Sequence, residues 1–186
     1  MSQTKKTNKL SEETTAARRK AIFTAAFECF LQYGYAKVSL DDIAKKARLS
    51  RPLLYLQFKN KEDLFVEMLR DLYMGLISEA HHIPELKISK KEKLNLIYEE
   101  ILLKLWSRII KSPNGKEFFD ECWQVCPQLA KDYDRETLKL LDAIFDDKKH
   151  AELFMLCING LCSDEPTTAT LRKRVQLLAD HFLRED

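Results

Sequence analysis

The chain has 186 residues, 45% of them hydrophobic and 32% charged, a composition typical of one globular domain or of a small domain joined to a larger one. Four glycines and five prolines are few for an all-β protein, no apolar run of about 18 residues could cross a membrane, and the polar N-terminus is unlike a signal peptide, so we expect a cytoplasmic protein. The net charge of +2 is unevenly distributed: residues 1–61 hold 13 Lys and Arg against 5 Asp and Glu (net +8), and residues 62–186 hold 18 against 24 (net −6), which indicates a polyanion-binding head on an acidic body.

The first predicted helix follows a polar tail. Residues 1–13 are rich in Ser, Thr and Lys, and we expect them to be disordered. From Arg18 to Tyr33 the apolar residues recur at i, i+3 and i+4, which predicts an amphipathic helix. Gly34 is expected to end it in the left-handed conformation.

Three further helix starts follow within about 25 residues. Ser39 precedes Asp42 by three positions, which predicts a capping box, and Ser50 is expected to repeat this arrangement. Asn60 begins a third helix with acidic residues in its first turn. We therefore predict helices beginning near 40, 51 and 61, with a tight turn at roughly 48–50.

Two helices joined by a tight turn, the second of them short, form a helix-turn-helix. Leu54 and Phe58 are predicted to anchor the short helix from its inner side. Its outer face is predicted to meet base edges or phosphates with four side chains: Arg51, Pro52, Leu53 and Gln57.

The stretch AIFTAAFECFLQYGYAKVSLDDIAKKARLSRPLLYLQFKNKEDLFVEML resembles the DNA-binding domain of the tetracycline-repressor (TetR-type) transcription regulators. The matching residues are Ile22, Ala26, Phe30, Gly34, Tyr35, Ser39, Ile43, Ala44, Ala47, Ser50, Leu54, Tyr55, Phe58, Lys61, Glu62 and Leu64. The resemblance covers about residues 16–70. It implies an all-α fold, with a helix-turn-helix DNA-binding domain at 14–64 and a larger helical effector-binding and dimerisation domain at 65–186.

The resemblance also implies which side chains meet DNA. Ser39 and Tyr55 should bond phosphates, Arg51 a phosphate or a guanine, and Lys61 adds a charge at a helix N-terminus. The complete set of expected DNA-binding residues is Ser39, Arg48, Ser50, Arg51, Pro52, Leu53, Tyr55, Gln57 and Lys61.

The chain departs from the family pattern at the turn and at the tip. Arg48 stands where the family usually has Gly, so it is expected to adopt a left-handed conformation at a cost of roughly 1–2 kcal/mol. Pro52 and Leu53 replace the usual Gly and Thr, and Leu56 and Gln57 replace an aromatic residue or His and a Tyr. We expect Leu53 to touch a thymine methyl group and Gln57 to read an adenine or bind a phosphate.

The remainder of the chain is also predicted to be helical. The predicted spans are 61–82, 89–111, 116–125, 127–145, 148–162 and 168–184. Residues 153–162 carry no charge, so this helix must be covered on every side, by a second subunit or as the central core helix of a monomer. The expected dimer-interface residues are Leu153, Leu156, Gly160, Leu161, Leu171, Val175, Leu178 and Phe182.

Large side chains of this body either line an apolar pocket or fill the core. The candidate pocket residues are Tyr98, Trp106, Phe119, Trp123, Phe145, Phe154 and Met155. These residues indicate that a ligand would be apolar or aromatic, and we expect no cofactor. The resemblance implies a small-molecule inducer that releases a homodimeric repressor from a palindromic double-stranded DNA operator. Two recognition helices about 34–36 Å apart would read such a palindrome.

Two alternatives remain open. Glu79 and His82 have the Glu-x-x-His spacing of metal-binding helical bundles, but only Asp147 and His150 offer a similar second pair, so we expect no enzyme. The five cysteines are expected to be reduced thiols: Cys29, Cys122, Cys126, Cys157 and Cys162. The pair Cys122 and Cys126 leaves open a DNA-binding regulator controlled by oxidation, or by a protein partner, instead of by a ligand.

Overall fold

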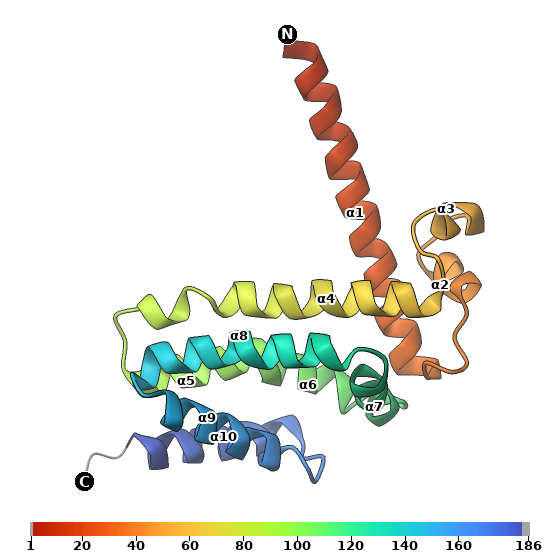
Figure 1. Cartoon of the computed structure of the whole chain (residues 1–186). Helices are drawn as coiled ribbons and strands as arrows, with labels where there is room; N and C mark the ends of the chain where they lie inside the picture. Colours follow the sequence, from red (N-terminus) through yellow and green to blue (C-terminus); the bar gives the residue numbers. More distant parts are fainter. Residues whose placement is uncertain (1, 184–186) are drawn as a thin grey trace. The chain divides into compact units, whose positions relative to one another are not determined.

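The computed structural model describes the backbone of residues 2–183 and the side chains of residues 15–183, and this part of the chain contains helices and no strand (Figure 1). The elements are α1 (Ser2–Tyr33), α2 (Leu40–Lys46), α3 (Arg51–Tyr55), α4 (Lys61–Ala80), the 3₁₀ helix η1 (Ile83–Glu85), α5 (Lys90–Tyr98), the π-helix η2 (Glu99–Leu103), α6 (Lys104–Ile109), α7 (Gly115–Val125), α8 (Pro127–Phe145), α9 (Lys148–Leu161) and α10 (Thr168–Phe182). The chain divides into two compact units between Met68 and Leu69, within α4.

The local signals predicted most helix ends of the N-terminal unit correctly. α2, α3 and α4 begin at the expected positions, and Gly34 ends α1 with a φ of 82°. The start of α1 differs, because the helix extends back to Ser2 through residues expected to be disordered. Residues 2–13 contain neither Gly nor Pro, so nothing in their backbone stops a helix from continuing beyond its packed part.

The predicted helix over 89–111 is interrupted by η2. A π-turn shifts the hydrogen-bond pattern of the backbone and leaves carbonyls to be satisfied from elsewhere. Here the hydroxyl of Tyr133 on α8 donates to the carbonyl of Ile101 at 2.7 Å. The periodicity of the apolar residues does not reveal this change, because a single π-turn alters the register by one residue only.

In the core of the N-terminal unit, the short helices α2 and α3 pack with α1 and α4. Phe30 of α1 packs edge-on against Phe65 of α4, with ring centroids 5.2 Å apart. Ile43 of α2 and Leu54 of α3 are both fully buried, and Phe58 is 2% exposed. The predicted inner face of α3 is therefore confirmed.

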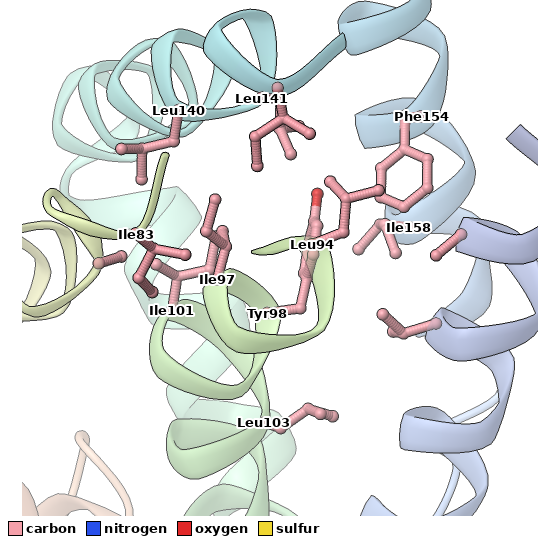
Figure 2. Packing of buried hydrophobic residues seen from close by; sticks show 14 of the residues in the cluster. Ile83, Leu94, Ile97, Tyr98, Ile101, Leu103, Leu140, Leu141, Phe154 and Ile158 are labelled. Atoms are coloured by element: carbon pink, nitrogen blue, oxygen red, sulfur yellow. The ribbon is translucent and has the colours of Figure 1, made fainter. Parts of the chain in front are cut away.

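The C-terminal unit has a separate core (Figure 2). Leu94, Ile97 and Tyr98 of α5 lie opposite Leu141 of α8 and Phe154 of α9, and all of them are buried. Burial of these apolar side chains is the main stabilising contribution in this unit. Tyr98 and Phe154, which we expected to line a pocket, are packed in this core, so these two assignments are wrong.

Candidate nucleic-acid interface

The tip of α3 presents side chains to the surface of the N-terminal unit. Arg51, Pro52 and Tyr55 are exposed, and Leu53 and Gln57 are half-buried. The structure thus shows the predicted inner face, Leu54 and Phe58, and exposes two of the four predicted outer residues, Arg51 and Pro52. Leu56, which follows the helix directly, is 83% exposed and was not among the expected DNA-binding residues.

The turn before α3 depends on an unusual backbone conformation. Arg48 has a φ of 57°, so the expected left-handed residue is confirmed. Its N–H donates to the carbonyl of Lys45 at 3.1 Å, which closes the end of α2. The Arg48 side chain is exposed, and it lies three residues before the start of α3.

Ser39 closes the predicted capping box at the start of α2. Its Oγ accepts from the backbone N–H of Asp42 at 3.2 Å and donates to Asp42 Oδ2 at 2.5 Å. The hydrogen bonds from Ser39 lower the pKa of Asp42 below its ordinary value, with smaller contributions from the charges of Lys45 and Arg51. The Ser39 hydroxyl proton is thus already held by a carboxylate, and its contact with phosphate stays a prediction.

Ser50 does not repeat this arrangement, which corrects the expectation. Its side chain makes no capping hydrogen bond. Pro52 has no N–H to donate, and the position that would return the bond is occupied by Leu53 instead of an acid. The α3 start is closed by the Ser50 carbonyl, which accepts from the N–H groups of Leu53 and Leu54 at 3.1 and 3.3 Å.

Lys61 is engaged within the domain. Its Nζ donates to the carbonyl of Tyr35 at 2.7 Å and to that of Ala36 at 3.3 Å, and it lies 4.4 Å from the centroid of the Tyr35 ring. Asn60 caps α4 as predicted, because its Oδ1 accepts from the N–H of Asp63 at 2.8 Å. A phosphate contact by Lys61 remains a prediction that must compete with these internal bonds.

Arg51 forms an ion pair that the sequence pattern did not reveal. Its Nη1 lies 2.9 Å from Oδ2 of Asp41 on α2, while 59% of the Arg51 side chain is exposed. The other carboxylate oxygen, Asp41 Oδ1, is buried without a hydrogen-bond partner. The only signal for Asp41 in the sequence is its place in the first turn of α2, where acids are common for helix-dipole reasons alone.

An open pocket of about 610 Å³ lies in the C-terminal unit, between α6, α7 and the end of α9. Three of the expected aromatic residues line it: Trp106, Phe119 and Trp123. Trp106 is held by its Nε1–H, which donates to the carbonyl of Pro166 at 2.8 Å. Lys116 and Glu165 lie 3.4 Å apart at the same pocket.

The other expected pocket residues do not line this pocket. Phe145 and Met155 pack against the core of the C-terminal unit, as Tyr98 and Phe154 do within it. The ring centroids of Phe145 and Phe154 are 5.3 Å apart. Helical periodicity could not distinguish a ring that lines a pocket from one that fills the core.

The face of α9 turned away from the core carries apolar side chains. Leu153 is 52% and Leu156 67% exposed, and Gly160 is exposed on the same face. A Cβ added at Gly160 would meet no atom within 4 Å. These three expected dimer residues are therefore accessible to a partner, and Leu177 of α10 is also 63% exposed.

The other expected dimer residues, Leu161 at the end of α9 and four residues of α10, pack on the core of their own unit, which corrects the assignment of the two that are fully buried. Leu171 and Val175 are buried in the core of their own unit, at 0% and 1% exposure. Leu161, Leu178 and Phe182 are partly buried against the same core, and the ring centroids of Phe182 and Phe154 are 5.1 Å apart. α10 has one apolar stripe, and its own subunit covers it.

The structure also describes the residues on which the metal-enzyme and cysteine-oxidation alternatives depend. Among residues 15–183, no three His, Cys, Asp or Glu side chains come together to hold a metal. Asp147 caps α9 by accepting from the N–H of Lys149 at 2.9 Å, and its Oδ2 lies 2.6 Å from His150 Nδ1. Cys122 and Cys126 are buried, and burial raises the pKa of Cys122 to about 12.

No helix in the described part of the chain has the combination of length and apolarity that crossing a bilayer requires.

Residues 22–68 match the family model described as "Bacterial regulatory proteins, tetR family". The chain is similar to the HTH-type transcriptional activator FasR of Mycolicibacterium smegmatis, with 27% identity over 130 residues that cover 69% of this chain and 58% of FasR. It is 37% identical to the HTH-type transcriptional regulator YhgD of Bacillus subtilis over 68 residues, which cover 37% of this chain and 36% of YhgD.

Among solved structures, a TetR-family transcriptional regulator from Mesorhizobium loti has the same fold, with a TM-score of 0.67 and 19% identity. The match covers 90% of this chain and 96% of that one. The sequence similarity thus spans 58% of the length of FasR and about a third of the length of YhgD. The structural similarity extends over both units of this chain.

Proposed function

Since the N-terminal domain of this chain belongs to the tetR family of bacterial regulatory proteins, we propose that the chain is a transcription regulator, most simply a repressor, that binds a palindromic operator as a homodimer. One observation supports this most directly. Leu54 and Phe58 anchor α3 on its buried side, and Arg51, Pro52 and Tyr55 are exposed. Residues 1–61 of the chain, which include α3, carry a net charge of +8. A short helix held in this way suits the major groove.

The contacts divide by chemistry. Tyr55 and the basic residues Arg48 and Lys61 bind phosphates, which position the domain and supply most of its affinity. Gln57 and Leu53 reach base edges, where an amide pairs with adenine and a methyl-bearing side chain packs on thymine. Because these two side chains are half-buried, direct contact with the bases requires that α3 lie deep in the major groove of the DNA.

Selection of bound sequences from random duplex DNA tests the function. We expect a palindrome with half-sites one helical turn apart. With about six phosphate contacts in the dimer, affinity for the selected site should fall on the order of 10³-fold between 50 and 200 mM salt. Recovery of no preferred sequence, or an affinity that does not respond to salt, would contradict the proposal.

The dimer forms through the outward face of α9. Leu153, Leu156 and Gly160 lie together there, and two copies would bury the leucines that one copy leaves exposed. Leu156→Glu should give a monomer with weak operator binding, measured by sedimentation and by titration with DNA. Leu96→Glu is the matched control, because Leu96 is 41% exposed on α5, outside this face.

A small apolar or aromatic inducer binds the pocket beside Trp106, Phe119 and Trp123. The volume of the pocket is within the range of sites for drug-sized ligands, and the pocket lining combines aromatic rings with a few polar groups. Trp123 is 54% exposed, so a ligand that covers it should change its fluorescence. A compound that binds should lower operator affinity in the same titration, and Trp123→Leu should weaken both effects. Ligands that bind without any effect on operator affinity would contradict the inducer role.

A further inference from the structure

The ion pair between Arg51 and Asp41 bears on how the recognition helix chooses its acceptor. Arg51 is the first residue of α3, at the end of the helix that reaches base edges in helix-turn-helix proteins. An exposed arginine at that position can contact either a phosphate or a guanine. Its guanidinium here lies 2.9 Å from a carboxylate of α2, so it does not face DNA as an isolated charge.

The neighbouring carboxylate changes the balance between the two acceptors. A phosphate carries a full negative charge and would approach Arg51 next to Asp41, where like charges repel. The O6 and N7 atoms of guanine are neutral acceptors and meet no such repulsion. A guanidinium has five N–H groups in a planar fork, so the donors that do not bond Asp41 can still take both guanine atoms.

The side chain of Asp41 is restricted by its surroundings. Its Oδ1 is buried, so neighbouring atoms limit the movement of the carboxylate, and 29% of the side chain is exposed. Its backbone belongs to α2, whose start is closed by the Ser39–Asp42 capping box. A carboxylate fixed in this way restricts the rotamers of Arg51 before DNA arrives, which reduces the entropy lost on binding. The negative charge of Asp41, next to the tip of α3, also weakens contacts with the DNA backbone. Asp41 therefore lowers the overall affinity for DNA while it raises the selectivity for guanine.

We infer that Asp41 is a positioning residue for sequence reading: it holds Arg51 for a guanine contact and keeps it off the phosphate backbone. This rests on the DNA-binding function proposed above, and it names one base and one additional residue of that interface.

The test compares affinity for the selected operator with affinity for the same site after replacement of the guanine nearest α3. The wild-type chain should prefer the guanine-containing site by roughly 5- to 150-fold, the range of one bidentate contact. Asp41→Asn should reduce this preference to a few-fold, strengthen binding to unrelated DNA and steepen the salt dependence by about 0.9 per subunit, because the released Arg51 can take a phosphate.

Glu28→Gln is the matched control. Glu28 pairs with Lys46 at 3.0 Å in the same unit, so this substitution also removes one negative charge and releases one cation. It should strengthen binding to unrelated DNA but leave the guanine preference unchanged. Asp41→Asn with a wild-type guanine preference would overturn the inference.

Arg51→Lys covers the case in which Asp41→Asn fails to fold, because Arg51 is exposed and lysine keeps its charge. It should lose the guanine preference and retain affinity for unrelated DNA, and an unchanged preference would overturn the inference. If either variant keeps the preference while the wild-type chain still selects a palindrome, only this inference fails. If the wild-type chain selects no sequence, the proposed function itself fails.

Discussion

Lys61 and Tyr35 are joined twice: the Lys61 ammonium donates to the Tyr35 carbonyl at 2.7 Å and lies 4.4 Å from the centre of the Tyr35 ring. This contact links the first turn of α4 to the connection between α1 and α2, 26 residues away in the chain. The Tyr35 ring in turn packs on Phe65, with centroids 4.8 Å apart. The same lysine is thus a stabilising residue and a candidate for phosphate binding.

Replacing Lys61 should separate the two roles. Lys61→Met removes a charged hydrogen bond and a cation–π contact, so we expect the free energy of unfolding to fall by roughly 1–2 kcal/mol. Urea denaturation measures this. Lys59→Met is the control, because Lys59 is exposed and should change stability little. Unchanged stability of Lys61→Met together with weaker operator binding would show that the internal contact contributes nothing.

Arg48→Gly should stabilise the helix-turn-helix and weaken its DNA binding. The left-handed φ of 57° strains a residue with a Cβ, and glycine relieves about 1 kcal/mol of that strain. The variant also loses one charge near the DNA, so the salt dependence of operator binding should become shallower. Arg48→Lys keeps both the strain and the charge, and it should match the wild-type chain. A lower melting temperature for Arg48→Gly would contradict this account of the turn.

The capping box at Ser39 predicts a specific response to acid. Ser39→Ala should lower stability by about 1 kcal/mol at neutral pH. The pKa of Asp42 is lowered in the folded state, so its contribution is complete above the ordinary carboxyl pKa near 4 and is lost as pH falls through the folded-state value. Denaturant titrations at neutral pH and below pH 4 should therefore show a smaller difference between Ser39→Ala and wild type in acid. A difference that grows in acid would refute this.

Gly115→Ala should disturb the start of α7. A Cβ at this position would lie 2.1 Å from the carbonyl oxygen of Ile109, and a backbone atom cannot move aside easily. We expect a loss of about 2 kcal/mol or more in the free energy of unfolding. Gly75→Ala is the control: its Cβ would meet nothing within 4 Å, and alanine in a helix should stabilise by about 0.5–1 kcal/mol. Equal effects of the two substitutions would contradict the packing at Gly115.

Oxidation should leave DNA binding unchanged. Cys122 is buried and its pKa is raised to about 12, so the reactive thiolate is scarce at neutral pH. Mild peroxide treatment should not alter operator affinity, and a thiol reagent should modify Cys122 only after unfolding. A loss of affinity that a reducing agent reverses would favour the redox-controlled alternative.

Local signals in the sequence were sufficient for the helical framework. Ser39, Asn60 and Gly34 act on groups within four residues of themselves, so their effect can be read from spacing alone. The same holds for the left-handed Arg48, because the tight turn requires that conformation at its own backbone. Ser50 shows the limit of such signals, since its neighbour Pro52 removes one of the donors that a serine cap uses.

The sequence by itself thus determined the helix-turn-helix, most of the helix boundaries and the inner face of α3, because each depends on nearby residues or on the helical period. Only the tertiary structure decided what covers each apolar face and which partner each charge has. Val175 faces its own core and Leu156 faces outward, although both are apolar residues in helices. Asp41 meets Arg51, and Tyr35 meets Lys61, because separate helices pack together, and periodicity within one helix carries no information about its neighbours.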